Sequence, residues 1–322
     1  MCSFCGLLRI FIQESKFKTI MRKIVTHSLS IALLAALFLT NCNNNSGEDE
    51  LPAELSGLNL IAMSESNGET EITNINLGSG LETRFDIDCM VLSSRVYDQA
   101  TKSFGYTACD QTFRMVSLAT GEQISSYALP GNISMAVIND REHVLIGTYY
   151  DQAAQRNHVI RLDLDNGTLL SDLIVEELGP MYTCTQFFNQ EQQTFHLISD
   201  QNKILTIDAI NGNVTGSVDI NSGTNITHFD EPSGMLYSIT YDRATETNYI
   251  EHTIVATGEL VKRVEVLSQS NYRLCVTDFD PATNSIVTVN SDNEVRYVNV
   301  DTGELVDTVP FDIEKTPVTF WQ

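Results

Sequence analysis

The chain has 322 residues, of which 42% are hydrophobic and 19% charged, and its formal net charge is −23 at pH 7. This charge repels phosphate backbones and anionic lipid headgroups, which excludes nucleic acid as a partner. It is compatible with a cationic ligand, a divalent ion or a basic protein surface, although a solvated acidic surface is its commonest meaning. The chain is long enough for two average domains or for one large all-β domain, each with a full core.

Residues 21–41 have the pattern of a secretory signal peptide. A pair of cations precedes an apolar run from Ile31 to Leu39, and a charged start followed by about 7–15 apolar residues is typical of such signals. The run is too short to span a hydrocarbon core, which needs roughly 20 apolar residues. We therefore interpret residues 1–20 as an extension upstream of the true start, and we give the CxxC spacing of Cys2 and Cys5 no metal or redox role.

The end of this segment, Leu39-Thr40-Asn41-Cys42, resembles a bacterial lipobox, in which the cysteine is acylated and becomes the new N-terminus. Asn41 stands where the pattern has Gly, Ala or Ser. By the same resemblance, Asn43 implies the outer membrane rather than inner-membrane retention. We expect an outer-membrane lipoprotein attached through Cys42, on the periplasmic or cell-surface side, with a secreted protein or a transmembrane anchor as alternatives. Residues 42–55 then form a polar, acid-rich and flexible tether.

The remaining residues, 56–322, repeat a glycine-containing turn at a regular interval. The turn reads LDLDNGTL at 162–169, IDAINGNV at 207–214 and NVDTGEL at 299–305. The turn glycines are Gly80, Gly121, Gly167, Gly212, Gly258 and Gly303. Successive glycines lie 41, 46, 45, 46 and 45 residues apart. A period near 45 across the whole region indicates a repeat architecture rather than two stacked domains.

The last complete unit predicts four strands, at 273–280, 285–290, 294–300 and 304–311. Its third segment, EVRYVNV, alternates polar and apolar side chains, as a half-buried strand does. The turn glycine supplies the positive φ that a tight hairpin needs, and the Asp or Asn before it hydrogen-bonds its own backbone. Four antiparallel strands in each repeat of this length are the unit of a β-propeller.

The two ends of the region predict the number of blades. The first unit has three strands and lacks the innermost one, whereas the C-terminal stretch TPVTFWQ, 316–322, has no unit of its own. Pairing the two completes a sixth blade, and closing the ring removes exposed sheet edges. We therefore predict an all-β, six-bladed β-propeller of four-stranded antiparallel blades that is closed by the C-terminal strand and is monomeric. The alternative is an open ring with a separate tail.

The repeat resembles the quinoprotein-like and YVTN-type propeller repeats. VNVDTGELVDTV at 298–309 matches their turn signature well, and RLDLDNGTLL at 161–170 and TIDAINGNVTG at 206–216 match it in part. Quinone-binding relatives carry a Trp after the Thr-Gly turn, but the only Trp here is Trp321. The resemblance therefore implies the fold without a bound quinone, and we predict no cofactor.

Residues that could carry chemistry are few. No GxSxG, HExxH, P-loop or helix-opening GxGxxG motif is present. We interpret the histidines of the repeat region, whose spacing fits no local metal site, as packing or strand-surface residues: His143, His158, His196, His228 and His252. Acidic residues recur at matching turn positions and indicate turn geometry before ligands: Asp98, Asp140, Asp230 and Asp280. No metal site is predicted, although the acidic charge remains compatible with a divalent cation.

Four cysteines lie in the repeat region, and an exported protein sees an oxidising compartment. Cys89 and Cys109 fall on the first and second strands of one blade, offset by about three residues in register. Their spacing permits a disulfide but does not favour it. Cys184 and Cys275 occupy equivalent positions two blades apart, too far to bridge, so we interpret them as small buried hydrophobic residues.

Two long loops predict a binding rim. Propellers usually bind at the face formed by the loops that join second to third strands and outer to next inner strands, which is an argument from fold alone. The loops at 149–157 and 241–248, in the third and fifth blades, are long, and 176–183 and 268–274 share their face. The candidate rim residues are Tyr149, Tyr150, Arg156, Tyr182, Tyr241, Arg243, Tyr272 and Arg273. Tyr and Arg are enriched at binding hot spots, but solvated hairpins with incidental aromatics would give the same pattern.

These observations lead to one main hypothesis and two alternatives. The main one is a non-enzymatic, lipid-anchored propeller that binds a protein or a small-molecule ligand at this rim and contacts the membrane only through its anchor. One alternative is an extracytoplasmic lyase or hydrolase that uses carboxylate and histidine groups at the mouth of the ring. The other is a docking platform within an outer-membrane assembly.

Overall fold

The computed structural model describes residues 57–66, 69–175, 181–199, 202–220, 226–267, 272–311 and 315–321. The predicted extension, signal peptide and tether, with Cys42, lie outside these residues. The described residues belong to one compact unit, Leu51–Gln322. Among them, no helix is long and apolar enough to cross a membrane.

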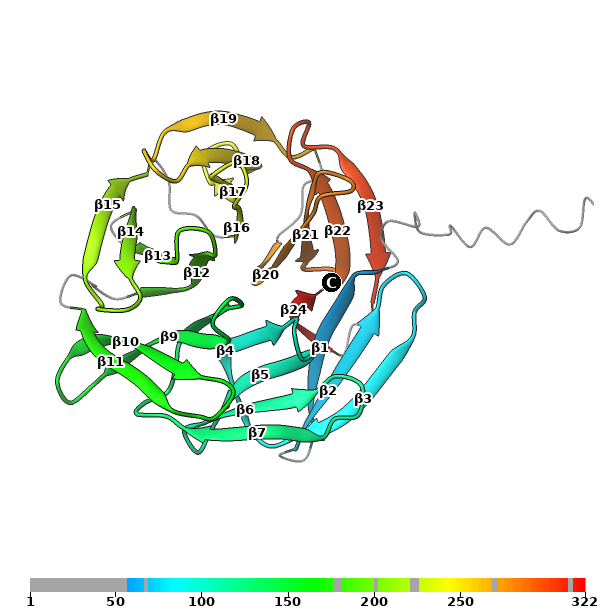
Figure 1. Cartoon of the computed structure of the whole chain (residues 1–322). Helices are drawn as coiled ribbons and strands as arrows, with labels where there is room; N and C mark the ends of the chain where they lie inside the picture. The colour runs from blue at the N-terminus through cyan, green and yellow to red at the C-terminus, as the bar shows by residue number, and fades with distance from the viewer. Residues whose placement is uncertain are drawn as a thin grey trace, which may run out of the picture. The chain divides into compact units, whose positions relative to one another are not determined.

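The described residues form 24 strands in six four-stranded antiparallel sheets, which are the blades of a ring (Figure 1). We number the blades 1 to 6 in chain order, starting with the blade that contains β1. From blade 1 to blade 6 the innermost strands are β24 (Thr316–Trp321), β4 (Met90–Asp98), β8 (Met135–Asn139), β12 (Met181–Asn189), β16 (Ile226–Asp230) and β20 (Tyr272–Asp280). The second strands are β1 (Asn59–Ser66), β5 (Ser103–Ala108), β9 (Val144–Asp151), β13 (Thr194–Ser199), β17 (Met235–Asp242) and β21 (Ser285–Asn290). The third strands are β2 (Glu69–Asn76), β6 (Thr112–Ser117), β10 (Arg156–Asp163), β14 (Lys203–Asp208), β18 (Thr247–Ile254) and β22 (Glu294–Asn299). The outer strands are β3 (Glu82–Ile87), β7 (Gln123–Ala128), β11 (Leu169–Val175), β15 (Val214–Asp219), β19 (Leu260–Glu265) and β23 (Leu305–Pro310).

The C-terminal strand closes the ring, as the sequence predicts. β24 is the innermost strand of blade 1 and pairs antiparallel with β1, with Leu60 opposite Phe320. The prediction of six closed blades is therefore confirmed. Closure by two ends of one chain leaves no innermost strand without a blade, which removes the sheet edge that an open ring would expose.

The core consists of apolar clusters between neighbouring blades. Six clusters are present among the described residues, one at each junction. Between blades 1 and 2, for example, Phe104, Tyr106 and Val318 are all at most 2% exposed. Burial of apolar area of this kind contributes about 25 cal/mol per Å². The blades therefore stabilise one another face to face around the ring.

Tall and short blades alternate. The second and third strands have eight residues each in blades 1, 3 and 5 but six in blades 2, 4 and 6. The innermost strands of blades 2, 4 and 6 begin at Met90, Met181 and Tyr272, each 91 residues after the last. The structural repeat is thus a pair of blades, a longer period than the 45 residues evident in the sequence.

The turn glycines adopt the backbone conformation that the sequence predicts. All six have a φ between 67° and 75°, in the left-handed region that glycine enters without strain. The residue four positions before the glycine does most of the side-chain bonding. Asp163, for example, accepts the amide of Asp165 at 2.8 Å, and Asn299 accepts that of Asp301 at 3.0 Å. These bonds define the turns between third and outer strands.

Candidate functional site

The connections of the ring fall on two faces. Because neighbouring strands run antiparallel, the hairpins between second and third strands lie on the same face as the connections from outer to next innermost strands. We call this the connector face, and the other the turn face. The β9–β10 and β17–β18 hairpins of blades 3 and 5, whose strands are two residues longer than those of the short blades, lie on the connector face.

Tyr150 and Tyr241 occupy equivalent places on these two hairpins, 91 residues apart. They are 50% and 44% exposed, although both belong to regular strands. Tyr150 lies opposite Asn157 and Tyr241 lies opposite Asn248, and both asparagines are buried. The two tyrosines therefore have the same cross-strand neighbour, a buried asparagine. They belong to blades 3 and 5, with blade 4 between them.

Aspartates order the hairpins that carry the predicted arginines. Asp151 accepts hydrogen bonds from the amides of Ala153 and Ala154 at 2.8 and 3.1 Å. The bond from Ala154 is the main cause that lowers the pKa of Asp151, and the bond from Ala153 adds to it. In blade 5, Asp242 accepts the amide of Ala244 at 2.9 Å. Arg156 and Arg243 are exposed on these hairpins. Hairpins held by such turns reduce the conformational entropy lost on binding.

Two further predicted rim residues, Tyr149 and Tyr272, do not join this exposed set. Tyr149 is 6% exposed, and its hydroxyl donates to Asp172 Oδ2 at 2.9 Å and lies 3.1 Å from His158 Nδ1. Burial, followed by the bond to Asp172, raises its pKa. Tyr272 is partly buried against the cluster between blades 5 and 6. The side chains of Tyr182 and Arg273 lie outside those that the structure describes.

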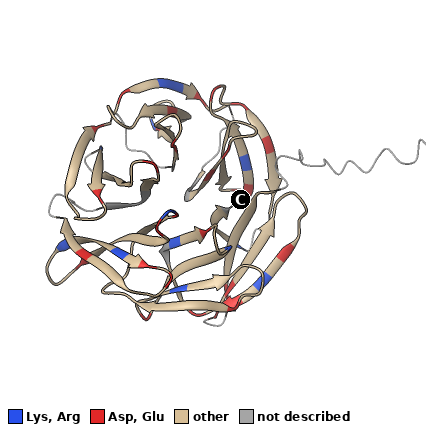
Figure 2. Cartoon of the chain, in the orientation of Figure 1, with Lys and Arg blue, Asp and Glu red and all other residues tan. Residues whose placement is uncertain are grey.

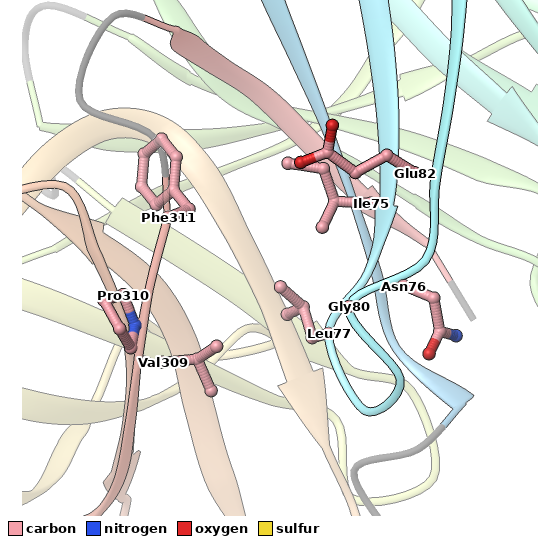
Figure 3. A pocket seen from close by; sticks show the side chains of 8 residues that line it. All are labelled: Ile75, Asn76, Leu77, Gly80, Glu82, Val309, Pro310 and Phe311. Atoms are coloured by element: carbon pink, nitrogen blue, oxygen red, sulfur yellow. The ribbon is translucent and has the colours of Figure 1, made fainter.

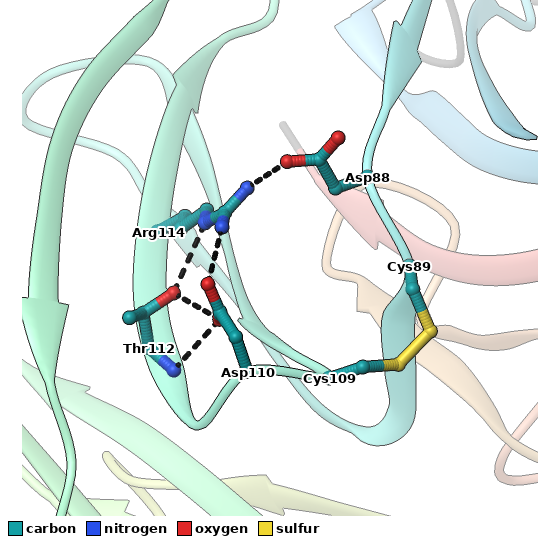
Figure 4. Close-up of a disulfide and its surroundings, with 6 residues drawn as sticks. All are labelled: Asp88, Cys89, Cys109, Asp110, Thr112 and Arg114. Carbon is teal, nitrogen blue, oxygen red and sulfur yellow. Dashed lines mark hydrogen bonds and ion pairs between the residues drawn. A yellow bond between two sulfur atoms is a disulfide. The ribbon is translucent and has the colours of Figure 1, made fainter.

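Cys89 and Cys109 form a disulfide on the connector face (Figure 4), which corrects the expectation that pairing is not favoured. Their Cα atoms lie 5.5 Å apart, and Cys109 N donates to Cys89 O at 3.1 Å. The three-residue offset in the sequence is real, but β4 absorbs it. Val91 lies opposite Thr107 and Arg95 lies opposite Tyr106, so three residues of β4 form a bulge.

Arg114 clamps the chain on both sides of this disulfide. Its guanidinium donates to Asp88 and, at 2.7 Å, to Asp110 Oδ2, although the side chain is only 15% exposed. The hydrogen bond to Asp88 is the main cause that raises the pKa of Arg114, and the bond to Asp110 adds to it. The connection from blade 1 to blade 2 is thus fixed covalently and electrostatically on this face.

The turn face links neighbouring blades through polar side chains. His143 of blade 3 lies 3.0 Å from Asp98 Oδ2 of blade 2 and 2.6 Å from Asp165 Oδ1. Burial opposes protonation of His143, but the bonds to Asp165 and Asp98 outweigh it and raise its pKa. Of the four acidic turn residues singled out in the sequence, Asp98 and Asp280 accept backbone amides of their own turns, at 3.0 and 3.1 Å.

Ionisable groups also occur on the innermost strands of blades 5 and 6, which are neighbours. The neighbouring blades enclose Asp278 on β20, although part of its surface remains accessible, and burial raises its pKa to about 6. Burial lowers the pKa of His228 on β16 to about 4. The His228 ring stacks on Phe279 with 4.9 Å between centroids. Groups with shifted pKa values near a ring centre are candidates for catalysis, but packing produces the same shifts.

No metal centre forms among the described residues, in which no three His, Cys, Asp or Glu side chains are arranged to hold an ion. A shallow hollow of about 620 Å³ on the turn face is lined by Asp140, Arg141, Gln190, Glu191, Glu231 and Pro232, so a cationic side chain lies among its three acidic residues. Acidic residues are spread over strands and turns all around the ring (Figure 2). Among the described residues, therefore, the acidic residues are not confined to one blade.

Comparison with known proteins supports the fold. No protein-family model and no curated protein matches the chain. Among solved structures it is similar to the WD40 domain of Toxoplasma gondii coronin, with a TM-score of 0.54, 12% sequence identity and coverage of 82% of this chain and 72% of that one. In total 1318 solved chains match, so the architecture is widespread. The protein is a six-bladed β-propeller with a WD40-like structural neighbour.

Proposed function

We propose that this protein is a non-enzymatic binding propeller that holds a protein partner on the connector face. The contact set consists of Tyr150 and Arg156 on blade 3 and Tyr241 and Arg243 on blade 5. The observation that carries the proposal is a repeated pair in the tall blades 3 and 5. In each of them an exposed tyrosine lies opposite a buried asparagine on the neighbouring strand. Tyr and Arg are enriched among the few residues that dominate the binding energy of protein interfaces.

Charge and spacing favour a protein over a small ligand. The two tyrosines belong to different blades with a third blade between them, so a ligand that contacts both must span the width of a blade. A net charge of −23 favours a partner with a basic surface and speeds its approach. The same charge disfavours nucleic acid. We expect the ring itself to be monomeric.

The test is capture of partners from an envelope extract on the immobilised protein. The Tyr150→Ala, Tyr241→Ala and Arg243→Ala triple variant should lose at least nine-tenths of the captured partner, because truncation of two or three hot-spot residues typically costs several kcal/mol. The matched control is Leu81→Ala with Ile210→Ala, which removes side chains 71% and 66% exposed in turns of the opposite face. Equal loss in both variants, or none in the triple variant, contradicts the proposal.

We further propose that the protein is an outer-membrane lipoprotein of the quinoprotein-like, YVTN-type repeat class, acylated at Cys42 after removal of residues 1–41. The lipobox-like sequence and the tether composition support this. Labelling with a palmitate analogue should mark the wild type but not Cys42→Ala, and the variant should leave the membrane fraction. A labelled Cys42→Ala protein, or a wild type without label, argues for a secreted protein instead.

An enzymatic function is the second candidate, because Asp278 and His228 lie on neighbouring innermost strands with shifted pKa values. A carboxyl group with a pKa of about 6 could act as a general acid or base in a lyase or hydrolase of glycans or lactones. Screening such substrates with wild type and Asp278→Asn decides the question. Turnover that Asp278→Asn reduces at least 100-fold would favour the enzyme, whereas equal background in both proteins would exclude this site.

A further inference from the structure

At five junctions the turn glycine of one blade is covered by the outer strand of the preceding blade. A Cβ atom at Gly121, Gly167 or Gly212 would lie 2.4, 2.2 or 2.7 Å from Phe85, Tyr127 or Leu173. At Gly258 and Gly303 it would lie 2.1 and 1.9 Å from the carbonyl oxygens of Asp219 and Glu265, beside Val218 and Val264. At three junctions, therefore, an apolar side chain fills the space over the turn, and at the other two a backbone carbonyl fills it with a valine side chain beside it.

The junction between blades 6 and 1 lacks this contact. Gly80 has the same backbone conformation, with a φ of 67°, but no described residue lies within 4 Å of the position of its Cβ. A cavity of about 300 Å³ opens there instead. Figure 3 shows Val309 and Phe311 on one side of the cavity and Ile75 and Leu77 on the other. Among the described residues, the space over this turn is therefore not filled by an outer-strand residue, as it is at the other five junctions.

The lining defines what can enter. Ile75 and Leu77 are 7% and 4% exposed, and Val309 and Phe311 are partly buried against the same cluster, so these four side chains form an apolar part of the wall, beside the polar residues Asn76 and Glu82. At the edge, Glu82 accepts hydrogen bonds from Arg84 and Lys315. The bond from Arg84 is the main cause that lowers the pKa of Glu82, Lys315 adds to it, and the carboxylate therefore stays ionised. Because Glu82 already has two cationic partners, the cavity offers apolar contact and not an open charge. An uncharged apolar side chain fits it best.

The chain itself brings such a side chain to this place. The described domain begins at Gly57, and Leu58 O accepts the amide of Leu77, a cavity residue, at 2.9 Å. Leu55 precedes Leu58 by three residues. Three residues span at most about 10 Å of extended chain, so Leu55 stays within reach of the cavity. Its own segment, LPAELS at 51–56, is more apolar than NNNSGEDE at 43–50.

We propose that the segment 51–56 docks at the junction of blades 6 and 1 and that the Leu55 side chain occupies this cavity. The contact replaces the outer-strand residue that the other five junctions supply. It shortens the tether predicted from the sequence and fixes the point at which the chain leaves the ring. The inference does not depend on the proposed binding function.

Cleavage by a glutamyl endopeptidase tests the proposal on the full mature chain. Cleavage after Glu54 should be at least tenfold slower than cleavage after Glu48, because a docked segment must open before it enters the protease. Leu55→Ser should remove the difference and lower the Tm by about 4 °C. The control Leu81→Ser, at a leucine that is 71% exposed on blade 1, should change neither quantity.

A filled cavity gives a second, independent readout. Val309→Trp occupies the space from the side of blade 6, so it should speed cleavage after Glu54 about tenfold without requiring the ring to unfold. Equal rates after Glu54 and Glu48 in the wild type, with an unchanged Tm in Leu55→Ser, would overturn the proposal and leave the cavity to a partner's side chain or a small apolar molecule. Unaltered cleavage in Val309→Trp would also overturn it.

Discussion

The junction between blades 6 and 1 and the other five junctions solve the same packing problem in different ways. All six bury an apolar cluster, but among the described residues an outer strand covers the next blade's turn glycine at five of them. Where blade 1 meets blade 6, its innermost strand is β24, from the other end of the chain. The comparison teaches that the inner strands can close the ring at a junction where no outer strand covers the turn glycine.

The largest effect is expected from a charge in the closing strand. Val318 on β24 is fully buried between blades 1 and 2, so Val318→Asp places an unpaired carboxylate in the core and should cost at least about 4 kcal/mol. Urea unfolding measures this loss. Thr316→Asp, at the exposed start of the same strand, should cost less than about 1 kcal/mol. Similar losses for both would mean that β24 does not hold the ring closed.

A pair of glycine substitutions compares the two kinds of junction directly. Gly80→Ala and Gly303→Ala both place a side chain at positive φ, which costs about 1–2 kcal/mol. Only at Gly303 does the new Cβ also meet a backbone oxygen, at 1.9 Å. Gly303→Ala should therefore cost about 4 kcal/mol in total, by chemical unfolding, and Gly80→Ala about 1 kcal/mol. Equal costs would contradict the difference between the junctions.

The disulfide secures blade 1 on its other side, at the connection to blade 2. It closes a loop with a sequence separation of 20 residues, for which chain entropy predicts about 3 kcal/mol of stabilisation. Cys89→Ser with Cys109→Ser should lose that amount in urea unfolding. Dithiothreitol should destabilise the wild type equally and leave the double variant unchanged. A reductant effect on the double variant would point to another cause.

The smallest effect concerns the polar link between blades 2 and 3. The bonds to Asp165 and Asp98 raise the pKa of His143 in the folded state. Its contribution is therefore complete below the unfolded pKa of about 6.5 and is lost as the pH rises through the folded value. His143→Gln should cost about 1 kcal/mol at pH 5.5 and less at pH 9. A cost that grows with pH would contradict this assignment.

The sequence predicts most of the fold because the turn glycines repeat at fixed intervals and the two chain ends complement each other. It does not reveal the disulfide, because the bulge in β4 that brings Cys89 level with Cys109 leaves no pattern of its own. The alternation of side chains between the two faces of a strand also does not predict which residues of other strands a side chain packs against. Tyr149 and Tyr150 are adjacent, yet the first is buried beside Asp172 and the second is exposed.

The cavity beside Gly80 escapes sequence analysis for a related reason. Gly80 has the same turn conformation as the other five glycines, since that conformation depends on local residues alone. The space around it depends on where β23 stands, which is a matter of tertiary packing. The exposed pair Tyr150 and Tyr241 is among the rim residues that the sequence predicts, and their spacing of 91 residues marks equivalent places in two tall blades.

The alternation of tall and short blades sets a rule for enlarging or reducing this ring. A module of 91 residues carries one blade of each kind, so its insertion or removal preserves every pairing of unlike neighbours. A module of about 45 residues would instead place two blades of the same height side by side, a kind of junction that this ring does not contain. Redesigned versions should therefore tolerate four or eight blades better than five or seven.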